Sequence, residues 1–524
     1  MRFLGKWLGI AVCWALTAQP SVATEDGLVF ARKAISFEAP PIAAGEALRV
    51  FSPEQDSLIV LTRDTEANHI IHLISADSLS SASPAPTQSV AVPKNAIFYA
   101  LGEMPDGEQE KLLIFTEKGI SAYNPFTNQF NPLVDTRSLF RQGTDLRFQR
   151  AGFARDVNDD SRFDLIVQDF DGLKLFYQRP DGSFSDPILI PVEPELRLTG
   201  AYSNDNISDT ALTAPVTRTP TFNIFPSYIS DATGDGKSDI SFLVGREFQI
   251  FAQTSDGTHT TQPVVTPFPF EVRGNSWRDE VLSQEQNSDQ SKFHEVTIYR
   301  ILDLNSDGAL DVVTVENLAS GALDRDQILN VYSGHYTAGK LAYDAAPNSK
   351  IELNGIGGAG FRDINDDGLS DVVTTTANIS IGKIISFLVN RRVSMRTSFF
   401  MNSNEGDFSE DRDYRRNRSI RFDLSKGQTL SPPFGYADFD GDGGLDLMEA
   451  DSRGRLKLLA GGAGESFTRE IGELKDTFPN EGWLVETEDI NNDDKADIIV
   501  RYNQFGLDGD ELATQLIVLS LIHI

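Results

Sequence analysis

One nonapeptide recurs six times between residues 156 and 497, and it carries oxygen side chains at alternate positions. Position 1 is Asp, position 3 is Asp, Asn or Thr, and positions 5 and 9 are Asp. Ca²⁺ takes about six to eight oxygen ligands, and a tight loop of this pattern directs its oxygens toward one point. Position 6 is Gly in four copies, Ser161 in the first and Asp494 in the last, where a positive φ reverses the chain.

The sequence therefore predicts up to six Ca²⁺ sites, each completed by the backbone carbonyl of position 7 and closed by the Asp at position 9. The predicted side-chain ligands, copy by copy, are Asp156, Asn158, Asp160 and Asp164; Asp231, Thr233, Asp235 and Asp239; Asp303, Asn305, Asp307 and Asp311; Asp363, Asn365, Asp367 and Asp371; Asp438, Asp440, Asp442 and Asp446; and Asp489, Asn491, Asp493 and Asp497. An EF-hand would need Glu at position 12, which only the fifth copy has, as Glu449.

The residues around each loop indicate strands. An apolar or β-branched triplet such as 498–500 follows every copy, and Asp171-Gly172 and Asp181-Gly182 form hairpin turns around 173–177. The repeating unit is a strand, a calcium loop, and then three more strands joined by turns. This order is typical of a β-propeller blade.

The nonapeptide and its flanking strands resemble the FG-GAP/VCBS repeat family, the calcium-loop β-propellers of integrin α-subunit heads and of many bacterial exported proteins. The resemblance covers about residues 150–505 through six copies. The family's Phe-Gly pair survives at Phe434-Gly435, whereas its Gly-Ala-Pro is absent. The resemblance implies an all-β propeller that binds calcium and is exported.

The spacing of the loops bounds the number of blades. Successive copies begin 51 to 75 residues apart, so residues 24–524 accommodate seven to eight four-stranded blades. We favour eight, with two degenerate blades in 48–75 and 96–123 and a strand within 28–37 completing the last blade. In a seven-bladed alternative, 48–75 is a cap or edge segment.

The N-terminus has the pattern of a signal peptide. Arg2 and Lys6 precede a short apolar stretch at 8–16, and Ser21-Val22-Ala23 supplies a small-x-small cleavage site. We expect cleavage after Ala23 and a single propeller domain over 24–524, located in the periplasm or outside the cell. The one cysteine, Cys13, lies in the leader, so disulfides and zinc thiolates are excluded from the mature chain. A lipoprotein interpretation of Cys13 is disfavoured by the bulky Val12 before it.

The formal net charge of −31 argues against nucleic acid as a partner, because nucleic-acid binders carry a basic surface. Polar insertions are expected at 195–222, 277–295 and 391–418. The third holds seven arginines against five acids, which is unusual in so acidic a chain. It is either an anion-binding patch for an acidic glycan or an acidic protein, or a salt-bridged surface hairpin.

Two classes of function remain open. A binding or scaffold module for a protein or a carbohydrate is favoured over a polysaccharide-active, lyase-like enzyme. His335-Tyr336 is the one candidate acid–base pair, and packing is the simpler interpretation of it. Repetition of the Asp residues with the blades favours cation ligands over catalytic carboxylates, since one active site does not repeat. No later apolar run is long enough to span a bilayer.

Overall fold

The computed structural model describes residues 28–521 apart from fourteen gaps of two or more residues and three single positions. The gaps are 106–107, 138–147, 193–194, 202–216, 224–225, 274–292, 320–324, 378–386, 404–405, 410–411, 424–427, 451–454, 463–466 and 503–510, and the single positions are 170, 354 and 480. The leader segment 1–23 lies outside the described residues. Within the described part of the chain, no helix is long and apolar enough to cross a bilayer.

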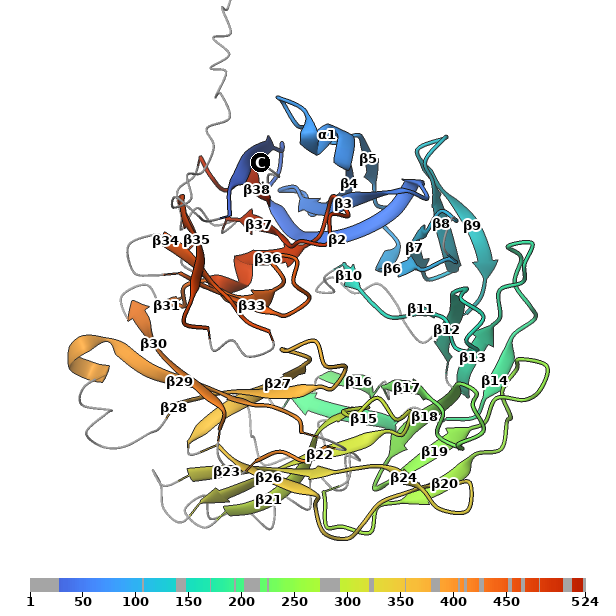
Figure 1. Cartoon of the computed structure of the whole chain (residues 1–524). Helices are drawn as coiled ribbons and strands as arrows, with labels where there is room; N and C mark the ends of the chain where they lie inside the picture. The colour runs from blue at the N-terminus through green and yellow to red at the C-terminus, as the bar shows by residue number, and fades with distance from the viewer. Residues whose placement is uncertain are drawn as a thin grey trace, which may run out of the picture.

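Eight antiparallel sheets follow one another around a ring and form an eight-bladed β-propeller (Figure 1). Blades 1 to 4 contain β2 (Pro41–Ser52), β3 (Gln55–Arg63), β4 (His69–Ser75) and β5 (Gln88–Ala91); β6 (Ala96–Gly102), β7 (Lys111–Thr116), β8 (Gly119–Asn124) and β9 (Gln129–Asp135); β11 (Ala154–Arg155), β12 (Asp164–Asp169), β13 (Gly172–Phe176) and β14 (Ile188–Ile190); and β17 (Ser227–Ser230), β18 (Asp239–Val244), β19 (Glu247–Phe251) and β20 (Val264–Pro267).

Blades 5 to 8 are built from the second half of the chain and from its first strand. They contain β21 (Phe293–Leu302), β22 (Asp311–Ala319), β23 (Arg325–Tyr332) and β26 (Ser349–Glu352); β27 (Ile356–Arg362), β28 (Asp371–Ala377), β29 (Arg392–Phe400), β30 (Tyr414–Asp423) and β31 (Gln428–Leu430); β32 (Phe434–Ala437), β33 (Asp446–Ala450), β34 (Arg455–Leu459) and β35 (Glu470–Lys475); and β36 (Val485–Glu488), β37 (Asp497–Arg501), β38 (Gln515–Leu521) and β1 (Phe30–Ser36).

The prediction of eight blades is confirmed, and the seven-bladed alternative is wrong. The stretch 48–75 is not a cap but supplies the end of β2 and all of β3 and β4 of blade 1. The predicted closing strand is also confirmed, because β1 pairs antiparallel with β38 from Phe30↔Leu521 to Ser36↔Gln515. The first and last described strands of the chain therefore share one sheet.

A few elements lie outside the regular blades. They are the helix α1 (Ala76–Ser80), the strand β10 (Gln149–Arg150) parallel to β6, the 3₁₀ turn η2 (Gly482–Leu484), and the hairpins β15 (Glu195–Ala201)–β16 (Thr217–Asn223) and β24 (His335–Tyr336)–β25 (Leu341–Ala342). Most of the expected insertion 277–295 lies outside the described residues, and 195–222 contributes the hairpin β15–β16. The segment 391–418 supplies β29 and half of β30, two strands of blade 6.

The core lies between the blades. Buried apolar residues of the described chain form eight clusters, and each cluster joins one blade to the next. Because side chains alternate along a strand, Val372 packs toward blade 5 while its neighbour Val373 packs toward blade 7. A blade is thus buried on both faces, which explains why the apolar triplets after the loops do not alternate with polar residues.

Candidate metal loops and arginine face

All six nonapeptides connect the first and second strands of a blade, in blades 3 to 8. The corresponding connection in blade 1 is a short turn between Ser52 and Gln55. The corresponding connection in blade 2 spans 103–110, and its Asp106 and Gly107 lie outside the described residues. The ring therefore carries the aspartate loops at equivalent positions in six consecutive blades.

Backbone N–H groups of each loop donate to its own carboxylates. In the fourth copy, Asp363 accepts from Asp367 N–H at 3.2 Å and from Gly368 N–H at 2.8 Å. The position-5 carboxylate of Asp367 accepts from Leu369 N–H at 2.9 Å. The chain therefore wraps around the carboxylates before any ligand is added, as the spacing predicts.

Positive φ angles occur at two positions of every loop. At position 6 they include Ser161 at 65° and Asp494 at 61°, so the reversal predicted there is confirmed even without glycine. Position 4 is also left-handed, for example Asp159 at 61° and Ser306 at 57°, and this was not predicted. The residues at position 4 are Asp, Gly, Ser, Asp, Gly and Asn, types that mostly tolerate this conformation, and this composition was an available signal.

The Asp at position 9 is buried and ties the loop to the far side of its blade. In Asp371, one oxygen accepts from Ile364 N–H at 2.9 Å and the other from Asn402 N–H at 2.8 Å, beyond β29. The second donor in the other five blades is Gln178, Gln253, Gly334, Gly461 or Leu521. The carboxylate predicted to close the metal shell thus also has a structural role that the sequence did not reveal.

Burial disfavours the charged form of these position-9 carboxyls. It raises the pKa of Asp164 and Asp311 to about 7 and that of Asp371 to about 6, against the lowering effect of the backbone donors. A nearby cation favours the carboxylate form, so such a group is chemically suited to a loop that holds a metal.

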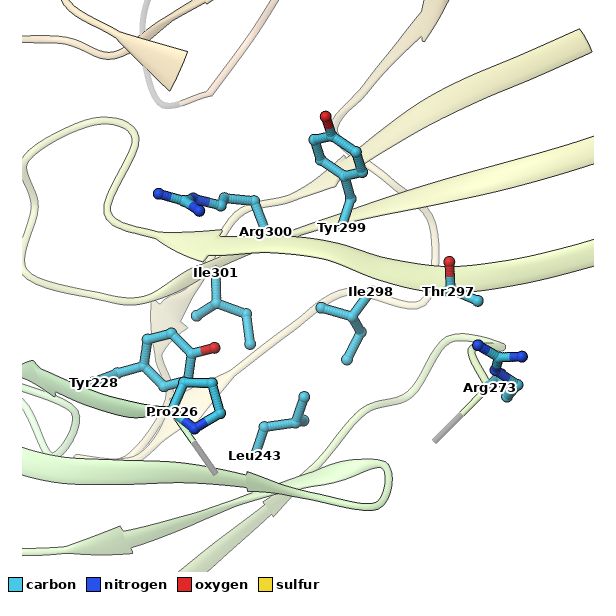
Figure 2. Close-up of a pocket in the computed structure, with 9 residues that line it drawn as sticks. All are labelled: Pro226, Tyr228, Leu243, Arg273, Thr297, Ile298, Tyr299, Arg300 and Ile301. Carbon is cyan, nitrogen blue, oxygen red and sulfur yellow. The ribbon is translucent and has the colours of Figure 1, made fainter. Parts of the chain in front are cut away.

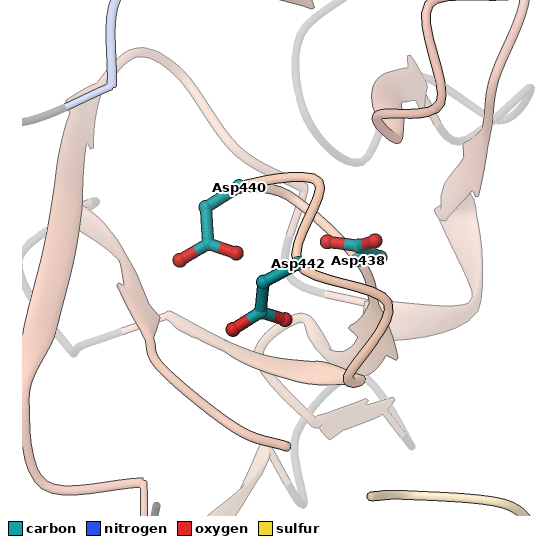
Figure 3. A group of neighbouring side chains, drawn as sticks. All are labelled: Asp438, Asp440 and Asp442. Atoms are coloured by element: carbon teal, nitrogen blue, oxygen red, sulfur yellow. The ribbon is translucent and has the colours of Figure 1, made fainter. Parts of the chain in front are cut away.

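Loop five brings three carboxylates together (Figure 3). One oxygen from each of Asp438, Asp440 and Asp442 lies within 4.8 Å of the others, and Asp446 is not part of this group. Among the described residues this is the one such group of acidic, histidine and cysteine side chains. The fifth copy is also the only one with a carboxylate at position 3.

The donor set of loop five fits a hard cation. Asp440 Oδ1 is buried and accepts no hydrogen bond within the described structure. Burial, followed by the repulsion of Asp442, raises the pKa of Asp440. In loop four the position-3 oxygen, Asn365 Oδ1, is likewise buried without a donor. Carboxylate and amide oxygens are the ligands that Ca²⁺ prefers, so these two atoms have ligand capacity to spare.

Neighbouring loops contact one another around the ring. Ser306 Oγ of loop three donates to the Gly368 carbonyl of loop four at 2.7 Å. The Asn158 carbonyl of loop one accepts from Gln253 Nε2 of blade 4 at 2.6 Å. The order of one loop therefore supports the order of its neighbour.

The hairpin β29–β30 presents arginines on both faces. Arg416 pairs with Glu449 of blade 7 at 3.4 Å, and the Arg418 guanidinium lies 4.1 Å from the centre of the Phe434 ring. The register pairs Arg396 with Asn417 and Ser398 with Arg415, so Arg396 and Arg415 lie on the other face. The hairpin is thus anchored to blade 7 on one face and carries free charge on the other.

We define the arginine face as Arg392, Arg396, Arg412 and Arg415. Burial, followed by repulsion from Arg415 and Arg412, lowers the pKa of Arg396, which places these three cations close together. Arg415 donates to Asn417 Oδ1, and among the described residues no acid pairs with Arg396, Arg412 or Arg415. Within the described structure, these three cations therefore lie close together with no acid paired to them.

The described acids of the segment are engaged elsewhere. Asp413 accepts from Met401 N–H at 2.8 Å, and Asp407 accepts from Ser349 Oγ at 3.3 Å. The remaining acids, Glu405, Glu410 and Asp411, lie outside the described residues. Neither described acid pairs with Arg396, Arg412 or Arg415, whereas Arg416 pairs with Glu449, so both interpretations of this segment stay predictions.

The candidate acid–base pair is part of the packing around the loops. Tyr336, on β24, donates its hydroxyl hydrogen to the Asp231 carbonyl of loop two, and its ring lies against Gly234. Burial, with the nearby aspartates, raises the pKa of Tyr336 to about 12, which disfavours its loss of a proton. Tyr336 therefore packs over the aspartate loop of blade 4 and links blade 5 to blade 4.

A cavity of about 560 Å³ lies between blades 4 and 5 (Figure 2). Ile298, Ile301 and Leu243 point into it, whereas Arg300 and Tyr299 extend from the opposite side of β21. Arg273 at its edge pairs with Glu295 at 2.6 Å. The described lining is therefore mixed, with apolar Leu243, Ile298 and Ile301 beside the polar side chains Tyr228, Thr297 and Arg273.

No family model and no curated protein sequence matches this chain. Similar solved structures include a lectin of Agrocybe aegerita that recognises non-reducing terminal N-acetylglucosamine, at 14% identity and a TM-score of 0.38, covering 93% of this chain and 99% of the lectin. They also include the Vibrio cholerae biofilm matrix protein Bap1, at 10% identity and a TM-score of 0.29, covering 93% of this chain and 90% of Bap1. A third is Sqt1 of Chaetomium thermophilum, at 11% identity and a TM-score of 0.36, covering 95% of this chain and 99% of Sqt1. The assignment of the propeller depends on the strand pairing of this chain itself.

Proposed function

We propose that the protein is an exported, calcium-stabilised β-propeller of the FG-GAP/VCBS type that binds an acidic glycan through its arginine face. The observation that carries the proposal is the group Arg396, Arg412 and Arg415, whose mutual repulsion no described acid relieves. An anionic ligand that binds between these cations would relieve their mutual repulsion.

The chemistry of arginine favours carboxylated or sulfated sugars. A guanidinium offers a planar fork of N–H donors that matches a carboxylate or sulfate in a bidentate arrangement. Two strands hold Arg392, Arg396 and Arg415 in register, so the spacing of these three arginines is fixed by the sheet. Repeated charges along a polyuronate suit several arginines on one strand pair.

Calcium supports this function by holding the ring in shape. The aspartate loops join strands of blades 3 to 8, and Asp438, Asp440 and Asp442 supply the strongest set of ligands. Blade 6, which carries the arginine face, has such a loop in Asp363–Asp371. We propose one Ca²⁺ in each of up to six loops.

The test is titration calorimetry of the mature chain with polygalacturonate in calcium buffer. Arg396→Glu/Arg415→Glu should weaken binding by about tenfold or more for each arginine, because a charged hydrogen bond contributes about 1.5–3 kcal/mol. Lys94→Glu/Lys350→Glu changes the net charge equally on other blades and should leave the affinity within about twofold at moderate ionic strength. Equal losses in both double variants would show that binding follows overall charge, and the proposal would fail.

A further inference from the structure

Two large apolar side chains are exposed to solvent immediately before β29, the first strand of the hairpin β29–β30. Leu388 is 62% exposed and Val389 is 74% exposed, in a helical turn directly before β29. They are the one pair of adjacent residues among the strongly exposed large apolar side chains of the described chain. Figure 1 shows the chain before β29 at the outer edge of the ring.

The backbone fixes this turn in place. The Arg391 N–H donates to the Phe387 carbonyl at 2.7 Å, which closes one helical turn around the two apolar residues. Arg391 then adopts a φ of 55°, which ends the turn and directs the chain into β29. The exposure of Leu388 and Val389 therefore comes from an ordered turn with a defined end.

Leu388 and Val389 form an apolar tip, and arginines begin immediately after it in the chain. Arg391 and Arg392 are exposed, and Arg396 and Arg415 follow along the hairpin. Since a strand rises about 3.3 Å per residue, Arg396 lies about 13 Å from Arg392. An apolar tip followed by cations over this length matches the order of acyl chains and phosphates at a membrane surface, where apolar groups enter about 5–10 Å.

We propose that this tip docks the propeller onto an anionic lipid surface, with Leu388 and Val389 entering the acyl boundary and Arg391 and Arg392 contacting lipid phosphates. The inference rests on the proposed function in that the arginine face supplies the charge, and it adds two apolar residues that a soluble glycan does not need. A chain of net charge −31 approaches an anionic bilayer only where its charge is locally reversed, as here. A stable protein interface needs about 1,000 Å² or more, and a two-residue tip is too small to form its centre.

The experiment is co-sedimentation of the mature chain, in calcium, with vesicles of phosphatidylcholine alone or of phosphatidylcholine with about one third phosphatidylglycerol. On the anionic vesicles, each arginine near the surface should strengthen binding about fivefold. The wild-type chain should sediment with the anionic vesicles only. Leu388→Asp/Val389→Asp should lose vesicle binding and keep its affinity for polygalacturonate. Arg396→Glu/Arg415→Glu should weaken both, and Phe126→Asp, at a side chain 88% exposed on blade 2, should change neither.

A second measurement reports on insertion directly. The emission of Val389→Trp should shift to shorter wavelength when anionic vesicles are added, because the indole leaves water. Wild-type protein that binds polygalacturonate but not the vesicles would overturn the docking inference and leave the proposed function standing. Vesicle binding that is unchanged in Leu388→Asp/Val389→Asp would also overturn it, since charge alone would then explain the adsorption.

Discussion

Removal of Asp442 should have opposite effects on stability in the absence and in the presence of calcium. Its carboxylate lies within 4.8 Å of those of Asp438 and Asp440, so without a cation the three groups repel one another. At that distance each pair costs about 0.9 kcal/mol even in the dielectric of water, and Asp442→Ala removes two such pairs. The loss of the bond that Gly444 N–H donates at 2.9 Å takes back part of this gain, because Gly444 is buried.

In calcium, Asp442→Ala should instead destabilise the folded chain. An ion that binds only the folded loop stabilises it by about 2.7 kcal/mol at one hundred times its dissociation constant, and Asp442→Ala forfeits most of this. We therefore expect a stabilisation of about 1–2 kcal/mol in EGTA and a destabilisation of about 2–3 kcal/mol in calcium. The assay is thermal unfolding of the wild-type and variant chains in both buffers.

Asp235→Ala in loop two is the matched control. Position 3 of that loop is the neutral Thr233, and Asp235 already pairs with Lys237 at 2.7 Å. Its removal should not stabilise the chain in EGTA, and it should cost less than Asp442→Ala in calcium. Equal destabilisation of Asp442→Ala in EGTA and in calcium would refute the reasoning, because it would show that the carboxylate acts only through hydrogen bonds.

Two further predictions concern groups away from the triad. His72 forms hydrogen bonds with Thr62 and Ser89, and burial lowers its pKa to about 4 from the usual 6.5. The unfolded chain therefore takes up a proton that the folded chain resists, and stability should fall by about 1–2 kcal/mol as the pH drops from 6.5 to 4. His72→Gln should show a smaller loss of stability in acid unfolding curves. Asp371→Ala should speed hydrogen exchange of the Ile364 and Asn402 amides at least about tenfold, and unchanged protection would contradict its structural role.

The regular part of this fold could be predicted from the sequence because it repeats. Six copies of one loop fixed the position of the first turn in each blade, and their spacing left room for the degenerate blades 1 and 2. The apolar segment containing Phe30 could be assigned to the last blade because the residues after Asp497 supply too few strands to complete it.

Long-range contacts could not be predicted in the same way. The second backbone donor to each position-9 carboxylate lies 14 to 31 residues away along the chain, as in Gln178 for Asp164 and Asn402 for Asp371. The bond from Tyr336 to Asp231 spans 105 residues. Which arginines share a face depends on the register of β29 and β30, and the sequence does not fix that register because both strands are rich in polar residues.

The central claim is that the aspartate loops are cation sites that hold the ring together, and calorimetry of the wild-type mature chain in EGTA and then in excess Ca²⁺ tests it most directly. Each occupied loop adds about 2.7 kcal/mol at one hundred times its dissociation constant, and contacts such as Ser306 to Gly368 carry this between blades. We predict that the melting temperature rises steeply with calcium. A melting temperature that does not change across the titration would contradict the account and identify the loops as solvated hairpin turns.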